Sequence, residues 1–373
     1  MSSGAPNQSV IARPARLARV HRPWTTELDS PRCLIGLIIG ALVAGCEGQT
    51  ISDASGTDAS TAPLHCNAPK TAVTLYHGGV TGLAVVGGQA VFVDQALFRV
   101  PLGGGSPTML AKVDEAYGLV VGGGFAYFTG SHAVGSVDPQ GKQSSESALF
   151  SAPITGGDPT LVRDQFSWLC AVGDESSVYI AGPATGDILR FTPPRTTPTR
   201  LNIGQLSIRA LTAHGSDLYV AAEDLSNSGA PHGAIVRVPK KGGAALKLVV
   251  TAGLPDDIAV DDHGIYWIEG PPYGTFGSGR IAGGDLSGGH VVTLSTTSAN
   301  AIALDDLYIY FVSDTLSRIP KNGGPAETLA HGLEGPGLLR ISGADAIWVD
   351  LFTRASSDPR PSALMAVCAN VGG

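Results

Sequence analysis

The stretch IAVDDHGIYW, Ile258–Trp267, and its near copy IALDDLYIYF, Ile302–Phe311, decide the fold. In each, an apolar segment is followed by a short acidic turn and then by a segment that carries aromatic residues. Strand-forming residues on both sides of so short a turn are typical of an antiparallel β-hairpin. The two stretches start 44 residues apart, which indicates an internal repeat.

Weaker copies of this hairpin extend the repeat over most of the chain. Seven copies start at Leu83, Leu119, Cys170, Leu211, Ile258, Ile302 and Leu339. Their mean spacing is about 43 residues, the length of a four-stranded propeller blade. The second segment is apolar on both faces, as in Ala126–Thr129 (AYFT) and Ile309–Val312 (IYFV). Such strands suit sheets that are covered on both sides.

A turn with one proline and two glycines follows the third segment of several copies. RVP at Arg99–Pro101 and Arg237–Pro239, and RIP at Arg318–Pro320, each precede a Gly-Gly pair. Proline ends the strand ladder, and glycine supplies the positive φ that the turn needs. We interpret the acidic residues of the first turns, such as Asp261 and Asp305, as turn formers. The sequence predicts an all-β protein: a single β-propeller of seven four-stranded blades.

An N-terminal strand is expected to close the ring. The last copy ends after its third strand, Ala363–Cys368, and Ala72–Tyr76 precedes the first copy as a strand without a blade. Pairing the two would remove both free sheet edges. Cys66 and Cys368 flank these strands, so we expect a disulfide between them, with two free thiols as the alternative. Cys170 is expected to be buried.

The composition agrees with a turn-rich β protein. Among 373 residues there are 50 Gly and 25 Pro, about a fifth of the chain against roughly an eighth in average proteins, and only 15% are charged. Long amphipathic helices and coiled coils are therefore excluded. With 43% hydrophobic residues the chain is not disordered. It contains no G-x-S-x-G, H-E-x-x-H, C-x-x-C or G-x-G-x-x-G motif, so the reactions that these motifs serve lack support.

The N-terminal region has the features of a secretion signal. Leu34–Gly45 is an apolar run of 12 residues, too short to span a bilayer, and five arginines precede it. It ends in Val43–Cys46 (VAGC), which resembles the bacterial lipobox, and the resemblance implies that Cys46 becomes the lipidated N-terminus. The expected organisation is a signal peptide over 1–45, a flexible tether over 46–64 and the propeller over 65–373. Cleavage would change the formal net charge from −8 to −11, which disfavours nucleic acid as a partner.

Two strands carry a family resemblance. Ile265–Glu269 (IYWIE) and Ile309–Asp314 (IYFVSD) are similar to the YWTD and NHL-like repeats of known propellers, and the RVPKxGG turn resembles that of secreted bacterial propeller lipoproteins. The resemblance covers residues 70 to 368. Only Tyr266 and Trp267 match the first two letters of YWTD, so the resemblance implies the fold and not a receptor function.

Ligands of propellers usually meet the loops that enter the first strands and those between second and third strands. By that rule the candidate ligand face consists of Tyr117, Trp168, Arg209, Asp256, Asp257, Tyr273, Asn300 and Glu334. Two longer loops, 130–148 and 269–279, are expected to extend this face. We assign no catalytic residue, no metal ligand and no cofactor.

We expect a monomeric, non-enzymatic binding or scaffold module of the cell envelope. The lipid at Cys46 would hold it on a membrane, with the outer membrane preferred, and its partner would be an envelope protein or a glycan. One alternative is a hydrolase or lyase with a central Ca²⁺ held by Asp256, Asn300 and Glu334. Another is a glycan-binding lipoprotein that uses Trp168 and Tyr273. The fold does not decide among these three.

Overall fold

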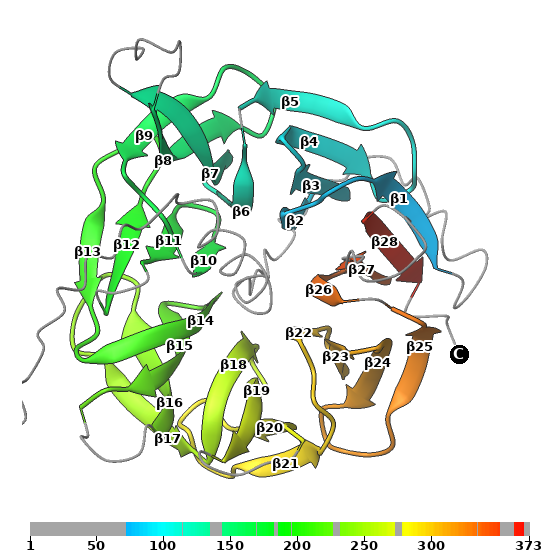
Figure 1. Cartoon of the computed structure of the whole chain (residues 1–373). Coiled ribbons are helices and arrows are strands. Elements are labelled where there is room, and N and C mark those ends of the chain that lie inside the picture. The colour runs from blue at the N-terminus through cyan, green and yellow to red at the C-terminus, as the bar shows by residue number, and fades with distance from the viewer. Residues whose placement is uncertain are drawn as a thin grey trace, which may run out of the picture. The chain divides into compact units, whose positions relative to one another are not determined.

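A computed structural model describes residues 72–113, 115–134, 144–168, 170–182, 186–194, 196–226, 232–272, 278–333, 335–350 and 362–368. Over these ranges the chain forms strands β1 to β28 and no helix. The strands make seven four-stranded antiparallel sheets, which Figure 1 shows as blades around a common centre. The chain is therefore a seven-bladed β-propeller, as the repeat spacing predicts.

The first four blades follow one another along the chain, each with its strands in sequence order. Blade 1 contains β2 (Gly82–Val86), β3 (Gln89–Val93), β4 (Ala96–Pro101) and β5 (Thr108–Lys112). Blade 2 contains β6 (Tyr117–Gly122), β7 (Phe125–Val134), β8 (Ser144–Pro153) and β9 (Thr160–Asp164). Blade 3 contains β10 (Cys170–Gly173), β11 (Val178–Ala181), β12 (Asp187–Phe191) and β13 (Thr199–Asn202). Blade 4 contains β14 (Leu206–His214), β15 (Asp217–Asp224), β16 (His232–Pro239) and β17 (Leu246–Thr251).

The last three blades complete the ring. Blade 5 contains β18 (Gly253–Val260), β19 (Ile265–Pro272), β20 (Arg280–Gly284) and β21 (Val292–Ser295). Blade 6 contains β22 (Ala301–Leu304), β23 (Tyr308–Val312), β24 (Thr315–Pro320) and β25 (Glu327–His331). Blade 7 contains β26 (Pro336–Ser342), β27 (Asp345–Asp350), β28 (Ala363–Cys368) and β1 (Val73–His77). The first strand of each blade lies innermost in Figure 1 and contacts the first strands of both neighbours, including β26 with β2.

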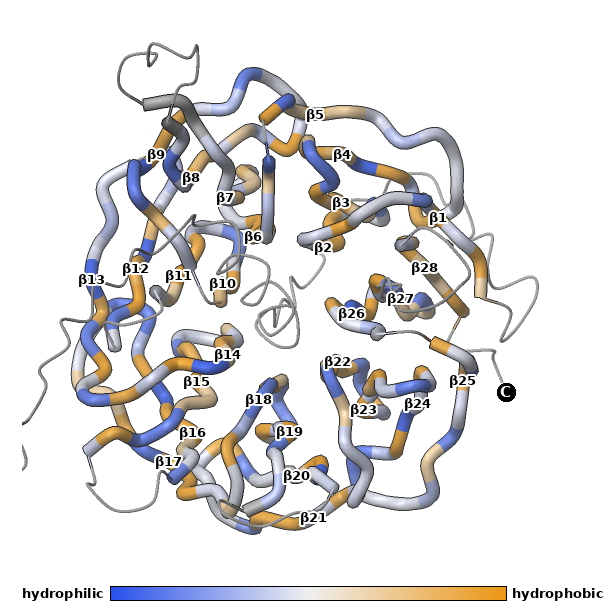
Figure 2. Tube along the Cα trace, viewed as in Figure 1, coloured by the Kyte–Doolittle hydropathy of each residue, from blue (hydrophilic) through white to orange (hydrophobic). Residues whose placement is uncertain are grey.

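Apolar side chains fill the spaces between neighbouring blades. The second strands are buried on both faces; Val178–Ala181 is fully buried, and Trp267 and Tyr310 have no exposed surface. Hydrophobic segments recur in every blade of Figure 2. Because burial of apolar area is the main driving force of folding, each blade is stabilised mostly by the two blades beside it.

The turns between third and fourth strands have the geometry that their Pro and Gly residues indicate. The N–H of Gly104 donates to the carbonyl of Pro101 over 3.0 Å, and Gly104 and Gly105 have φ of 88° and 135°. The same contact recurs in blade 4, where the N–H of Gly242 donates to Pro239 over 2.9 Å. Positive φ is strained for other L-residues, so glycine is required here.

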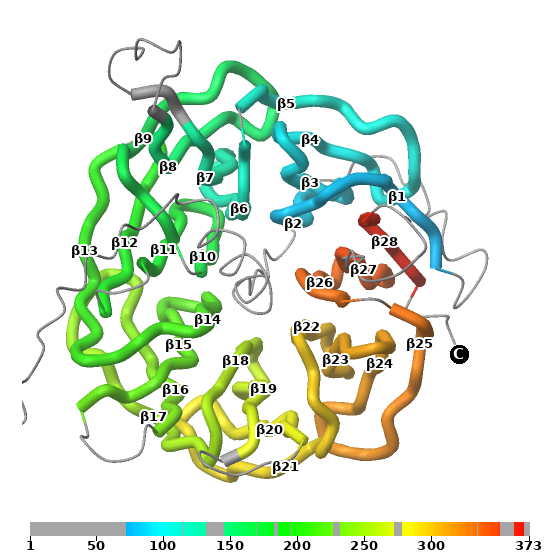
Figure 3. Tube along the Cα trace, in the orientation of Figure 1, coloured from blue at the N-terminus to red at the C-terminus, as the bar shows by residue number. Residues whose placement is uncertain are grey.

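The N-terminal strand closes the ring. β1 pairs antiparallel with β28 in the register Val73↔Ala366 to His77↔Ala363, which confirms the predicted closure. Figure 3 shows blue β1 alongside red β28. Cys368, at the end of β28, is buried, whereas Cys170 is a buried free thiol, as expected. Cys66 lies outside the described residues, so its pairing with Cys368 stays a prediction.

An aromatic cluster joins blade 7 to blade 1. The ring centroid of Tyr76 on β1 lies 4.6 Å from that of Phe92 and 6.1 Å from that of Phe98. The hydroxyl of Tyr76 donates to Asp94 Oδ2 over 2.8 Å. Burial, with the neighbouring Asp94 carboxylate, raises the pKa of Tyr76 to about 12. The phenol therefore remains a hydrogen-bond donor at physiological pH.

Two loop predictions are wrong in part. Residues 130–148 were expected to form a loop, but β7 and β8 pair from Phe125↔Pro153 to Val134↔Ser144. Strand pairing uses the backbone, so the small and polar side chains of this segment do not prevent it. Likewise β19 continues to Pro272, and Glu269, expected to begin a loop, pairs with Arg280 in the sheet.

Replacing Phe92 by Ala is expected to reduce the free energy of unfolding by about 3–5 kcal/mol, because Phe92 is fully buried in the cluster that joins blades 7 and 1. Urea unfolding of the purified propeller measures the change. Met109→Ala on outer strand β5 is the control in the same blade: this side chain is 56% exposed, so its loss should change stability by only about 0.5 kcal/mol. Equal effects of the two substitutions would contradict a closing role of the cluster.

Candidate functional site

The predicted ligand residues that the structure describes lie at one end of the inner strands. Tyr117 starts β6, Trp168 precedes β10, Arg209 lies in β14, Asp256 and Asp257 lie in β18, and Asn300 precedes β22. Tyr273, Glu334, Cys46 and Cys66 lie outside the described residues. Arg209 and Asp256 contact each other, and most of these candidate residues contact a neighbouring blade.

Arg209 and Asp256 form an ion pair between blades 4 and 5. Arg209 Nε donates to Asp256 Oδ1 over 3.1 Å and to the carbonyl of Pro255 over 3.2 Å, and Nη2 also contacts the carboxylate. Arg209 lies at an irregularity in the β14–β15 register, between Ile208 and Ala210. Both side chains are more than a third exposed. The pair is therefore open to a ligand, but its charges are already matched.

Asp257 joins blades 5 and 6 from a buried position. Its Oδ1 accepts the N–H of Ile258 over 2.9 Å, and its Oδ2 accepts the N–H of Ile302, on β22, over 2.8 Å. Removal from water raises the pKa of Asp257 to about 7, although the two N–H groups and Arg340 favour the carboxylate. The sequence placed Asp257 on a ligand face, whereas the structure places it inside a joint.

Asn300 is exposed and faces the next blade. Its Nδ2 donates to the carbonyl of Pro336, at the start of β26, over 3.3 Å. Asp256 thus binds blade 4 while Asn300 binds blade 7, so no described contact brings them together as a shared metal site would require. Among the described residues, no group of three or more His, Cys, Asp or Glu side chains is arranged to hold a metal ion.

Trp168 packs across the joint between blades 2 and 3. A Cβ on Gly118 would lie 2.5 Å from Trp168 Nε1, so the indole lies directly against the Gly118 backbone, whose φ is 56°. Trp168 is half-buried beside the core cluster of these blades. Tyr117, next to Gly118, is also half-buried, and burial together with the Glu115 charge raises its pKa.

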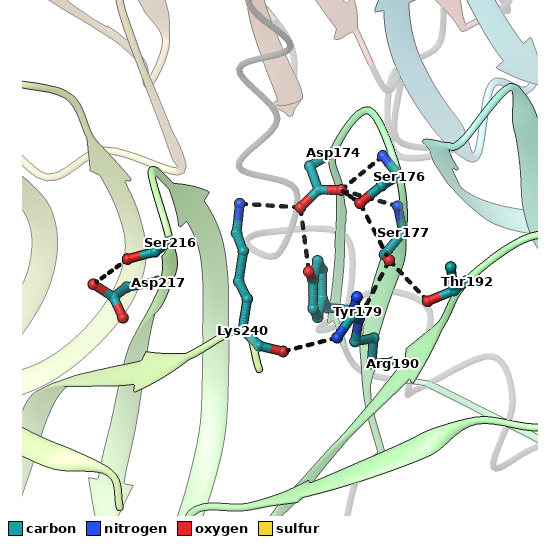
Figure 4. A network of polar contacts seen from close by, with 9 residues as sticks. All are labelled: Asp174, Ser176, Ser177, Tyr179, Arg190, Thr192, Ser216, Asp217 and Lys240. Atoms are coloured by element: carbon teal, nitrogen blue, oxygen red, sulfur yellow. Dashed lines mark hydrogen bonds and ion pairs between the residues drawn. The ribbon is translucent and has the colours of Figure 1, made fainter. Parts of the chain in front are cut away.

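At the other end of the inner strands, lysines bind acidic turns of the preceding blade. Lys240, in the β16–β17 turn of blade 4, lies 3.0 Å from Asp174 Oδ2 in the β10–β11 turn of blade 3 (Figure 4). Lys321 of blade 6 contacts Asp261 of blade 5 in the same way. Neither contact was predicted from the sequence. The recurrence of lysine after proline in two turns, Pro239-Lys240 and Pro320-Lys321, is the signal that could have indicated a shared role.

The acidic turns are also hydrogen-bonded within their own blades. Asp174 Oδ1 accepts the N–H groups of Ser176 and Ser177, each over 2.9 Å, and Tyr179 donates its hydroxyl to Oδ2 over 3.2 Å (Figure 4). Burial alone would raise the pKa of Asp174, but the Ser176 N–H and Lys240 hold it below its usual value. Asp261 and Asp305 accept two backbone N–H groups each, which confirms that they are turn formers.

A further polar contact that the sequence did not predict lies inside blade 5. Glu269 is 1% exposed; it accepts the indole N–H of Trp267 over 2.9 Å and a hydrogen bond from Arg280 Nε over 2.5 Å. The charge of Glu269 is therefore balanced by Arg280, eleven residues later on β20. Because these partners enclose Glu269, its carboxylate stabilises the interior of blade 5.

No known protein family matches the chain by sequence, and no curated protein matches it. Solved structures match its fold. The β-propeller domain of the Trilobed protease from Pyrococcus furiosus, which has an open velcro topology, aligns with a TM-score of 0.57 and 11% identity over 79% of this chain and 97% of that chain. Here, by contrast, β1 pairs with β28.

Two enzymes contain similar folds. Hydrazine synthase of Kuenenia stuttgartiensis aligns with a TM-score of 0.50 and 10% identity, over 67% of this chain and 79% of that chain. A prolyl endopeptidase aligns with a TM-score of 0.50 and 14% identity, over 73% of this chain and 46% of that chain. Identities this low indicate the fold alone.

Replacing Gly118 by Ala is expected to displace Trp168, because the new methyl group would overlap the indole. Acrylamide quenching of tryptophan fluorescence should increase, and the protein should lose about 2 kcal/mol or more of stability. Gly124→Ala is the matched control: it lies in the same blade at φ 77°, with open space at its Cβ position. Identical quenching in both variants would show that Trp168 does not depend on Gly118.

Proposed function

We propose that this chain is a lipid-anchored β-propeller of the bacterial cell envelope that acts as a non-enzymatic binding or scaffold module. Residues 1–45 would be its signal peptide, residues 46–64 its tether and residues 65–373 its propeller, with Cys46 as the lipidated residue. The lipobox-like Val43–Cys46 and the apolar run that it ends support this location in the cell envelope. The described residues hold no helix that is long and apolar enough to span a bilayer.

One observation carries the binding role: the polar residues of the candidate ligand face hold neighbouring blades together. Arg209 pairs with Asp256, Asp257 binds Ile302, and Asn300 binds Pro336. A catalytic group must instead be directed at a substrate. Arg209, Asp256 and Asn300 are the exposed members of this set and form a rim that is held in place by these contacts before any ligand arrives. Such preorganisation favours binding because less freedom is lost on association.

The disulfide is part of the same proposal. Cys368 is not a free cysteine, and Cys66 precedes the strand that pairs with β28. A bond between them would link the chain covalently at the closure of the ring. The oxidising conditions outside the cytoplasm permit such bonds.

The anchor predicts how the protein partitions between detergent and water. Expressed with its leader in a bacterium, the wild-type protein should enter the detergent phase of a Triton X-114 extraction, and Cys46→Ser should remain in the aqueous phase. Cys33→Ser is the matched control, since Cys33 precedes the apolar run and would leave with the signal peptide; it should behave as wild type. An aqueous wild-type protein would contradict the anchor.

The rim predicts where partners are found. A photo-crosslinking amino acid at exposed Asn300 should give discrete adducts with envelope components in living cells. The same amino acid at Asp262, which is 92% exposed at the opposite end of the inner strands, is the control and should give fewer adducts. Equal adducts from both positions would contradict a role of the rim in binding.

A further inference from the structure

Strands β7 and β8 extend beyond the rest of blade 2. Each has ten residues, more than any other described strand, and the two pair with each other along their whole length. β6 pairs with β7 only as far as Thr129, and β9 pairs with β8 only as far as Ala148. Beyond these points Gly130–Val134 and Ser144–Ser147 form a two-stranded ribbon, which we call the arm.

The segment before β6 binds blade 1 and not the arm. Thr81, just before β2 of blade 1, donates its hydroxyl to the carbonyl of Ala116 over 3.3 Å. The carbonyl of Thr81 accepts the N–H of Gly118 over 3.2 Å. Among the described residues, no strand other than β8 pairs with Gly130–Val134. One edge of the arm is therefore open over these five residues.

This open edge lacks the usual protection against strand pairing. Exposed edges in soluble proteins commonly carry charged residues, above all lysine, or proline. Outer strands of other blades follow this rule, with Lys112 on β5 and Lys247 on β17. Gly130–Val134 (GSHAV) contains no Lys, Arg, Asp, Glu or Pro. Because a two-stranded ribbon alone is only marginally stable in water, a third strand would stabilise the arm.

A carboxylate lies beside the open edge. Ser131 donates its hydroxyl to Glu115 Oε2 over 2.8 Å, and Glu115 is exposed. The charge of Glu115 also acts on Tyr117, where it helps burial to raise the pKa of the phenol. Glu115 therefore stands between the arm and the candidate ligand face. Within the described part of the chain it has no ion-pair partner, so its charge attracts a basic group from outside.

We propose that the open edge of the arm binds an extended segment of a partner polypeptide, which pairs with Gly130–Val134 as an added β-strand and places a Lys or Arg beside Glu115. This inference rests on the proposed binding role and names the partner as a protein. Main-chain hydrogen bonds supply the affinity, and the contact with Glu115 supplies the preference for a basic residue. The added strand continues the position of β6 in the sheet, beyond Tyr117.

The fluorescein-labelled peptide KTVKVTK tests the added strand on the purified full-length protein. We expect saturable binding by fluorescence anisotropy, and hydrogen exchange of the amides in 130–134 should slow by about 5- to 10-fold on saturation. The same peptide with residues 2 to 6 N-methylated keeps its charges but has lost its internal donors, and it should bind at least about 10-fold more weakly. No binding at about 1 mM peptide, unchanged exchange, or equal affinity of the two peptides would overturn the proposal.

Charge reversal tests the role of Glu115. Glu115→Lys should weaken binding of KTVKVTK at least about 10-fold and should strengthen binding of the acidic peptide ETVEVTE. Glu175→Lys is the matched control, since it makes the same change at an exposed residue of the β10–β11 turn, at the opposite end of the inner strands, and should leave both affinities unchanged. Equal effects of the two substitutions would mean that only the overall charge matters, against the proposal.

A second copy of the chain is the other strand that could pair with the arm. A dimer in sedimentation without peptide, with the amides of 130–134 already protected, would overturn the proposal in favour of self-pairing. Failure of the arm is distinct from failure of the proposed function. Adducts at Asn300 without any binding of KTVKVTK would overturn the arm alone and leave the binding role in place.

Discussion

The structure depends on the requirement that both faces of every blade be covered. The second strands are apolar on both sides, so a blade without a neighbour would expose a hydrophobic sheet to water. A row of such blades satisfies this requirement only if it closes on itself. Two features close the ring. β1 completes blade 7, and the chain that follows it enters blade 1. The aromatic cluster of Tyr76, Phe92 and Phe98 packs these two blades together.

Polar contacts reinforce the joints at both ends of the inner strands. At one end they involve Arg209, Asp257 and Asn300, and at the other Lys240 and Lys321. The middle of each joint is apolar, and burial there is not directional, whereas the hydrogen bonds and ion pairs at its ends require particular partners. The apolar layers therefore supply most of the stability, and the ends define how neighbouring blades align.

The repeat spacing, the doubly apolar second strands and the Pro-Gly-Gly turns were enough to predict seven blades and their closure, because these features follow from local periodicity and turn chemistry. The candidate face was harder. Arg209 and Asp256 lie at the end of the inner strands where the loop rule placed them. Each is the other's partner, although they belong to adjacent blades and are 47 residues apart in the chain. Glu269 was assigned to a loop, because nothing local shows that Arg280 and Trp267 would enclose it. The repeat pattern predicts each blade because it recurs along the chain. The contacts between blades are harder to predict because they depend on side chains that differ from one repeat to the next.

The composition of blade 7 has a mechanical consequence. Its four strands include both the first and the last strand of the described chain, and β1 is held there by backbone hydrogen bonds to β28 and by its packing. If Cys66 and Cys368 are not bonded, a pulling force applied to the chain before Ala72 acts on that pairing first. Loss of this five-residue strand would leave blade 7 with three strands and the other six sheets with all their strands.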